Sequence, residues 1–180
     1  MKLQILFASS TGHTEYIAEK INNLVPDSIL QNIDNINQVK IFRDCEMLIC
    51  CIPTWNTGAD EERSGTSWDN KIKEIRQIDF SKTLVGIVGL GDSAAFSKYF
   101  CDAMEELYSA FKAAGANMIG EVSTEDYIYD NSKSVIDGMF CGLPIDEDNE
   151  SEKTDERLRN WLENILSDHQ KWKSYLNGKD

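Results

Sequence analysis

Short apolar runs alternate with amphipathic stretches along the chain. The runs span residues 2–8, 28–33, 47–52, 84–89 and the segment that begins at 118–122. Between them, apolar residues recur at helical spacing around residues 14–25, 68–75, 100–111 and 158–165, with a weaker stretch at 39–42. This alternation of strand and helix predicts an α/β fold, a doubly wound five-stranded parallel sheet.

Two of these patterns predict which residues form the core. Met47–Ile52 is a continuous apolar run that stops at Pro53, as expected for a central strand covered on both faces. In the third helical stretch, Trp68, Ile72 and Ile75 lie at spacings that place them on one face. We expect that face to pack on the sheet.

Two segments depart from the alternation. Residues 123–140 are polar and aromatic and are long for a loop, which usually indicates an insertion or a functional segment. The chain after residue 168 is polar. With 180 residues in all, we expect a single domain at residues 1–168 and a polar C-terminal extension at residues 169–180.

The charge is strongly acidic, with 31 acidic against 18 basic residues and a formal net charge of −13. This balance disfavours nucleic acid and anionic membranes as partners and favours proteins with basic surfaces. An acidic surface also keeps a protein soluble, so charge alone does not select a function.

Five cysteines and the absence of long apolar stretches suggest where the protein works. No two cysteines form a C-x-x-C pair, and no stretch approaches the roughly 20 apolar residues of a membrane span. We expect reduced thiols, no membrane insertion and a cytoplasmic location, or an organelle stroma if a targeting peptide was removed. The cysteines are Cys45, Cys50, Cys51, Cys101 and Cys141.

The first predicted strand runs directly into a loop rich in hydroxyl groups, Ser9-Ser10-Thr11-Gly12-His13-Thr14. The N–H groups at a helix start are unpaired and carry partial positive charge, so such a loop suits a phosphate. The loop has no Lys or Arg. Neutral donors fit the phosphate of a bound cofactor better than a transferred phosphoryl group, which usually requires Lys and a metal.

Two further loops should meet this one, because ligands of such sheets bind outside the carboxyl ends of the strands. They are Pro53-Thr54-Trp55-Asn56-Thr57-Gly58 and the stretch from Gly89 to Phe96. Trp55 and Phe96 would then lie at the mouth of one crevice. Two aromatic rings beside a phosphate site predict a flat, phosphorylated ligand stacked between them.

These three loops resemble the flavodoxin family, small proteins that carry electrons on FMN. The resemblance extends in order over nearly the whole chain, and it includes Phe100–Leu107, Gly142–Asn149 and Thr154–Arg157. It implies the flavodoxin-like strand order 2-1-3-4-5, with residues 123–140 as the loop that interrupts the fifth strand of long-chain flavodoxins. The acidic stretch Gly58–Gly65 is similar to forms from photosynthetic organisms.

The resemblance also implies a set of FMN contacts. It assigns the phosphate to the hydroxyls and amides of Ser9, Ser10, Thr11, Gly12, His13 and Thr14. It places Trp55 and Phe96 on the two faces of the flavin ring and Asp148 at the ribityl chain or ring edge. It assigns the Asn56–Thr57 peptide to the N5–H of the semiquinone. The remaining expected contacts are Pro53, Thr54, Gly58, Gly89, Leu90, Gly91, Asp92 and Phe100.

The sequence departs from the family pattern at a few of these positions. Phe96 stands where the outer ring is usually Tyr, and Ser93-Ala94-Ala95 replaces the usual Gln-x-Gly. His13 stands where Lys is common. Losing a glycine restricts the backbone, so the sequence leaves the conformation of the loop before Phe96 open.

The function implied is a low-potential one-electron carrier that cycles FMN between semiquinone and hydroquinone, without catalytic residues or a metal. An acidic pocket opposes negative charge on the reduced flavin and so lowers its potential. Implied partners are basic redox proteins such as ferredoxin–NADP reductase and, in a photosynthetic source, photosystem I, and we expect a monomer. The alternative is an FMN-dependent NAD(P)H:quinone reductase of the same fold.

Rival site types fit less well. Gly89-Leu90-Gly91-Asp92-Ser93-Ala94 matches the dinucleotide pattern G-x-G-x-x-G/A, but it follows the fourth strand rather than the first. No Walker loop is present, and the hydroxyl loop lacks the cysteine of a low-molecular-weight phosphatase. The acidic run from Asp146 to Glu152 lacks the spacing of an EF-hand and is expected to be a solvated loop.

Overall fold

A parallel β-sheet forms the centre of the computed structural model, which describes residues 3–167. Its strands run in the order β2-β1-β3-β4-β5, with β9 pairing to β4 as well, and every pairing in this sheet is parallel. The predicted doubly wound sheet and its strand order are therefore confirmed. The strands are β1 (Leu3–Phe7), β2 (Ile29–Asn32), β3 (Met47–Pro53), β4 (Leu84–Leu90), β5 (Asn117–Ile119) and β9 (Leu143–Ile145).

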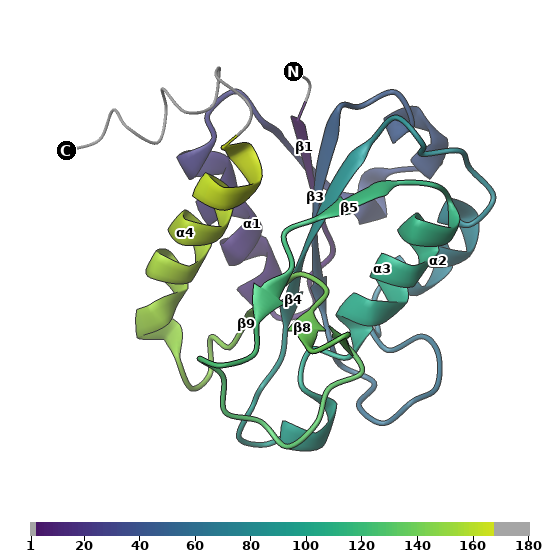
Figure 1. Cartoon of the computed structure of the whole chain (residues 1–180). Helices are drawn as coiled ribbons and strands as arrows, with labels where there is room; N and C mark the ends of the chain where they lie inside the picture. Colours follow the sequence, from purple (N-terminus) through teal and green to yellow (C-terminus); the bar gives the residue numbers. More distant parts are fainter. Residues whose placement is uncertain (1–2, 168–180) are drawn as a thin grey trace.

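Within residues 3–167, four α-helices cover the sheet in two layers. Helices α1 and α4 lie on one face, and α2 and α3 lie on the other (Figure 1). The α-helices are α1 (His13–Leu24), α2 (Trp68–Ile75), α3 (Ala103–Ala113) and α4 (Thr154–Leu166). The structure also has short 3₁₀ helices, which are η1 (Ile33–Asn35), η2 (Val39–Phe42), η3 (Ser97–Tyr99) and η4 (Ser151–Lys153).

Each layer of helices encloses an apolar core against the sheet. All seven residues of β3 are buried, as expected for a strand between two layers. Trp68, Ile72 and Ile75 form the buried face of α2, as their spacing predicts. The indole N–H of Trp68 donates a hydrogen bond of 2.9 Å to the Cys51 carbonyl, so the ring anchors α2 to β3 without an unpaired polar atom.

The fifth strand position is shared by two segments. β5 pairs with the first three residues of β4, and β9 pairs with its last three. The expected strand at 118–122 ends at Ile119, because Gly120 takes a φ of +85° and turns the chain away. Only glycine fits there, since a Cβ would lie 2.5 Å from the indole nitrogen of Trp161.

The intervening chain forms a small antiparallel sheet of its own, in the order β6-β8-β7, which sequence analysis did not predict. Phe140 and two tyrosines of this segment pack around Phe100, with ring centroids 5.9–6.3 Å from its centroid. The segment is therefore fixed against the residues that precede α3. Its strands are β6 (Val122–Ser123), β7 (Val135–Ile136) and β8 (Met139–Phe140).

The cysteines lie inside the fold. All five are buried, and burial raises the pKa of the Cys50 and Cys51 thiols. Protonated thiols of this kind are poor nucleophiles. Among residues 3–167, no helix is both long and apolar enough to cross a membrane. The predicted extension at residues 169–180 lies outside the described residues.

Candidate functional site

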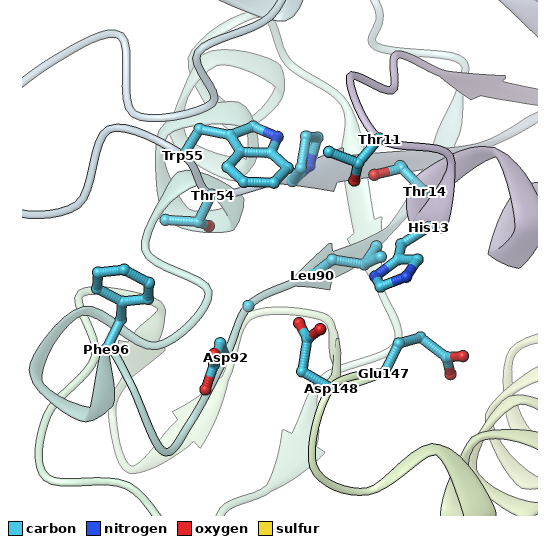
Figure 2. Close-up of a pocket in the computed structure, with 12 residues that line it drawn as sticks. Thr11, His13, Thr14, Thr54, Trp55, Leu90, Asp92, Phe96, Glu147 and Asp148 are labelled. Carbon is cyan, nitrogen blue, oxygen red and sulfur yellow. The ribbon is translucent and has the colours of Figure 1, made fainter.

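A cleft of about 290 Å³ opens at the carboxyl ends of β1, β3 and β4. The three loops predicted to converge contribute to it, together with the loop after β9 (Figure 2). Its walls are largely apolar near Trp55 and Leu90 and polar near Thr11 and Asp148. The residues that line it are Thr11, His13, Thr14, Pro53, Thr54, Trp55, Leu90, Gly91, Asp92, Phe96, Glu147 and Asp148.

The hydroxyl loop joins β1 to α1 and presents unused donors to the cleft. Ser9 Oγ accepts a hydrogen bond of 3.0 Å from the Gly12 N–H, which closes the turn, and α1 begins at His13. Within the described chain, the hydroxyls of Ser10, Thr11 and Thr14 have no hydrogen-bond partner. Free hydroxyls at a helix start are the donor set that an anion requires.

Trp55 follows β3 and is held by its backbone rather than by its ring. The N–H groups of Trp55 and Asn56 both donate to the Arg63 carbonyl at 3.1 Å, and Thr54 N–H donates to Leu90 O at 3.1 Å. Gly65 has to be glycine, because a Cβ there would lie 2.8 Å from that of Trp55. The fixed backbone leaves the indole 49% exposed beside the cleft.

The turn after Trp55 continues the second loop beyond the residues that line the cleft. The Asn56 carbonyl accepts a hydrogen bond of 3.2 Å from the Ala59 N–H, and the Asn56 side chain donates to the Glu62 carbonyl at 2.6 Å. Gly58 packs against the ring of Tyr99. The loop that follows Trp55 therefore contacts the segment that follows Phe96.

Asp92 determines the conformation of the loop before Phe96, which the sequence left open. Its carboxylate accepts the N–H groups of Ala94 and Ala95 at 3.0 and 2.7 Å, and its carbonyl accepts the Phe96 N–H at 3.0 Å. This local turn places the Phe96 ring at the edge of the cleft, 46% exposed (Figure 2).

Asp146 links that loop to the one after β9. It is fully buried, and its carboxylate accepts N–H groups of Ser93, Asp148 and Asn149 at 2.9–3.1 Å. The Asn149 side chain also bridges Asp146 and Asp92. One buried carboxylate thus fixes two walls of the cleft relative to each other.

Acidic groups dominate the charge of the cleft. Asp92, Glu147 and Asp148 line it, and no Lys or Arg among residues 3–167 does. Figure 2 shows the Glu147 and Asp148 side chains on the side of His13. Thr154 Oγ1 donates to Glu147, which fixes that carboxylate from α4. The backbone N–H of Ala95 and the side chain of Asn149 lower the pKa of Asp92, against a smaller opposing effect of burial.

The lowered pKa of Asp92 predicts a pH dependence of stability. A carboxyl group whose pKa is lower in the folded state stabilises that state fully above its ordinary pKa of 3.8, and the contribution disappears as pH falls through the lowered value. We expect Asp92→Asn to flatten the loss of unfolding free energy below about pH 4. Urea denaturation from pH 6 to pH 2 measures this, and parallel curves for the two proteins would contradict it.

The cleft contains eleven of the predicted site residues: Thr11, His13, Thr14, Pro53, Thr54, Trp55, Leu90, Gly91, Asp92, Phe96 and Asp148. Ser9, Ser10, Gly12, Asn56, Thr57 and Gly58 belong to its surrounding loops without lining it. Glu147 lines the cleft and was missed, although it precedes Asp148 in the same acidic run.

Two predicted contacts lie behind the cleft rather than in it. Phe100 is buried in the aromatic cluster with Tyr127, Tyr129 and Phe140, because Cys101 takes a positive φ of 56° and α3 begins only at Ala103. A Cβ on Gly89 would point at Met104 and Cys101. Both positions support the walls from inside the core, and their contact with the cofactor stays a prediction.

The geometry fits a flat, phosphorylated ligand. Hydroxyls without a partner in the described part of the chain lie at the start of α1, and the exposed rings of Trp55 and Phe96 belong to the same cleft. An aromatic ligand could stack on these rings while its phosphate reaches the hydroxyl loop.

Comparison with known proteins gives one consistent result. The family model described as Flavodoxin matches residues 5–161. A flavodoxin of Buchnera aphidicola is 38% identical over 92% of this chain and 95% of its own length. Flavodoxin 2 of Escherichia coli is 33% identical over 93% of this chain and 96% of its own. The crystal structure of Fusobacterium nucleatum flavodoxin bound to flavin mononucleotide superposes with a TM-score of 0.84, at 31% identity over 93% of this chain and 98% of that one.

Proposed function

The chain belongs to the flavodoxin family, and we propose that it carries single electrons on an FMN held non-covalently in the cleft described above. It is an electron-transfer protein rather than an enzyme, and we propose that it is of the long-chain form. The observation that carries the proposal is the joining of the free hydroxyl loop and the two exposed rings in one cleft. Bound FMN supplies one-electron redox chemistry, and the protein supplies binding and electrostatics.

The hydroxyl loop is proposed to bind the FMN phosphate. Thr11 and Thr14 line the cleft, and Ser10 lies between Ser9 and Thr11 with its hydroxyl unpartnered. The N–H groups of the first turn of α1 add donors that no carbonyl within the helix can use. His13 lines the same part of the cleft and would add a positive charge when protonated.

Trp55 and Phe96 are proposed to contact the flavin ring, and the backbone of Leu90, Gly91 and Asp92 its polar edge. The Asn56–Thr57 peptide is the backbone group proposed to respond to the redox state. Turning the Asn56 carbonyl toward the flavin would exchange its 3.2 Å hydrogen bond from Ala59 for a bond to the cofactor. The cost of this exchange is of the order of one hydrogen bond, about 1 kcal/mol.

The acidic lining supports a low reduction potential. Asp92, Glu147 and Asp148 line the cleft, in a chain with a net charge of −13. Negative charges around a site of low dielectric constant disfavour the addition of further negative charge. The protein is therefore proposed to be a strong one-electron donor when reduced.

FMN binding tests this proposal directly. The flavin-free protein is titrated with FMN while flavin fluorescence is recorded, and then the complex is reduced stepwise with dithionite. We expect stoichiometric uptake with fluorescence quenching, followed by two separate one-electron steps. A protein that leaves FMN fluorescence unchanged would contradict the proposal. Turnover of NADPH with a quinone and no added reductase would favour the reductase alternative instead.

Redox proteins are the partners of this family, and we propose ferredoxin–NADP reductase and, in a photosynthetic source, photosystem I as specific ones. The acidic residues Asp60, Glu61 and Glu62 are exposed on the loop that follows Trp55. They suit a partner with a basic rim around its own cofactor. A cytoplasmic or stromal location, proposed from the cysteine content, suits these partners.

Ionic strength is expected to separate docking from flavin binding. Raising salt from 0.01 to 0.5 M should lower the second-order rate constant for electron transfer to a basic redox protein by about tenfold or more, because screening shortens the reach of the surface charges. The FMN content should stay constant, since neutral donors hold the phosphate. Stopped-flow mixing measures the rate, and a rate independent of salt would exclude electrostatic docking.

A further inference from the structure

We propose that the buried ion pair between Glu106 and Arg63 positions Trp55 and the Asn56–Thr57 peptide, and thereby sets both the affinity for FMN and its reduction potential. This inference rests on the proposed function. Glu106 belongs to α3 and lies outside the cleft, so it would act through Arg63 as a positioning residue. The contacts that link it to Trp55 form a continuous chain.

The first link joins Glu106 to the loop after Trp55. Its carboxylate accepts the backbone N–H of Glu62 at 3.0 Å through Oε1 and that of Arg63 at 3.1 Å through Oε2. Arg63 Nε lies 3.4 Å from the same Oε2. Glu106 is 7% exposed and Arg63 4%, so water competes little for these bonds.

The second link joins Arg63 to Trp55. The carbonyl of Arg63 accepts the N–H groups of both Trp55 and Asn56 at 3.1 Å. Asn56 is further tied through its side chain to the carbonyl of Glu62. Whatever fixes the backbone of residues 62 and 63 therefore fixes the backbone of the proposed flavin contacts.

The loop depends on this anchoring because its backbone is not in a relaxed conformation. Glu62 has a positive φ of 58°, which a side chain other than glycine rarely adopts. Such a conformation persists only where surrounding contacts enforce it. The two hydrogen bonds to Glu106 engage the backbone N–H groups of residues 62 and 63 and so help to hold them in place.

The guanidinium of Arg63 is held by two glutamates, Glu105 and Glu106. Its Nη2 pairs with Glu105, but within residues 3–167 its Nη1 is a buried atom without a hydrogen-bond partner. Asp102 Oδ2 is also buried without one. The pKa of Asp102 is raised, because the effect of burial outweighs the lowering by the Lys133 N–H and by the charges of Arg63 and Lys133. Asp102 is thus a third acid near Arg63 that does not bond to it, and the orientation of Arg63 depends on Glu105 and Glu106.

The two glutamates give a matched pair of variants. Glu106→Gln removes one acceptor oxygen and places an amide NH₂ against the N–H of Glu62 or Arg63. Glu105→Gln alters side-chain contacts with Arg63 and Ser109, and Glu105 accepts no backbone N–H from the described loop after Trp55. For each purified protein, FMN affinity is measured by titration, and both one-electron midpoint potentials are measured at saturating FMN. Thermal unfolding of the FMN-free form serves as a measure of folding.

We expect Glu106→Gln to weaken FMN binding by about tenfold, the equivalent of 1.4 kcal/mol. We also expect at least one midpoint potential to shift by about 59 mV, the one-electron equivalent of a tenfold change. Glu105→Gln should change affinity by less than about threefold, which is under 1 kcal/mol. A loss of stability alone would leave the potentials of the bound flavin unchanged, so the potentials identify positioning.

Affinity and potentials that match the wild type in Glu106→Gln would overturn the inference, as would equal effects of the two variants. If Glu106→Gln does not fold, Arg63→Lys tests the inference instead. This variant keeps the positive charge and loses the planar guanidinium that contacts both glutamates. Its potentials should shift, and unchanged potentials would overturn the inference. Failure of the wild type to take up FMN would instead refute the proposed function.

Discussion

Replacing Trp55 by alanine is expected to weaken FMN binding by about 1–3 kcal/mol, without a comparable loss of protein stability. The indole is half exposed, so the folded protein gains little from its burial, whereas a stacked flavin would cover its free face. The backbone of Trp55 is held through Arg63 and does not depend on the ring. Fluorescence titration with FMN measures the effect.

Ile29→Ala provides the control for this variant. Ile29 is 49% exposed, as Trp55 is, but it lies at the amino end of β2, away from the carboxyl ends that form the cleft. Its replacement should leave the dissociation constant of FMN unchanged. An unaltered FMN affinity in Trp55→Ala would remove Trp55 from the binding site and with it the stacking model.

Replacing Asp146 by alanine is expected to lower the free energy of unfolding of the FMN-free protein by about 2–4 kcal/mol. Three backbone N–H groups lose the fully buried carboxylate that accepts them, and the Asn149 amide keeps only Asp92 as an acceptor. The loops after β4 and β9 would then separate, so FMN binding should also weaken. Urea denaturation gives the unfolding free energy from its midpoint and slope.

Asp148→Ala is the matched control for stability. Asp148 is exposed two residues further along the same loop, and its carboxylate accepts no hydrogen bond from the part of the chain that the structure describes. We expect a stability change within about 0.5 kcal/mol. Equal stability of the Asp146 and Asp148 variants would show that the buried carboxylate does not hold the two loops together.

Local sequence patterns predict most of the scaffold. β3 is an unbroken apolar run because both of its faces are covered, and α2 shows its buried face in the spacing of Trp68, Ile72 and Ile75. The hydroxyl loop is recognisable because its donors are consecutive in the sequence. Features that depend on adjacent residues, or on one period of a helix, are therefore accessible without a structure.

Features that depend on distant residues are not. Glu106 and Arg63 are 43 positions apart, and Ser93 and Asp146 are 53 positions apart, so no local sequence pattern predicts either pairing. Phe100 continues the apolar stripe of α3, which predicts a helix, but the positive φ of Cys101 separates it from the helix. The spacing of apolar residues indicates which side chains are buried, but it does not indicate where the backbone leaves the helical conformation.

The divided fifth strand has a consequence for how this protein could be shortened. Asn117–Ile119 pair with residues 84–86 of β4 and Leu143–Ile145 with residues 88–90, so only Ile87 lies between, with Gly142 against its carbonyl. Excising residues 120–141 would splice Ile119 to Gly142 and restore an uninterrupted strand in the same register. The insert also covers Phe100 and donates hydrogen bonds to the carbonyls of Phe100 and Cys101. A truncated chain would thus keep its sheet and would need a polar replacement at position 100 to remain soluble.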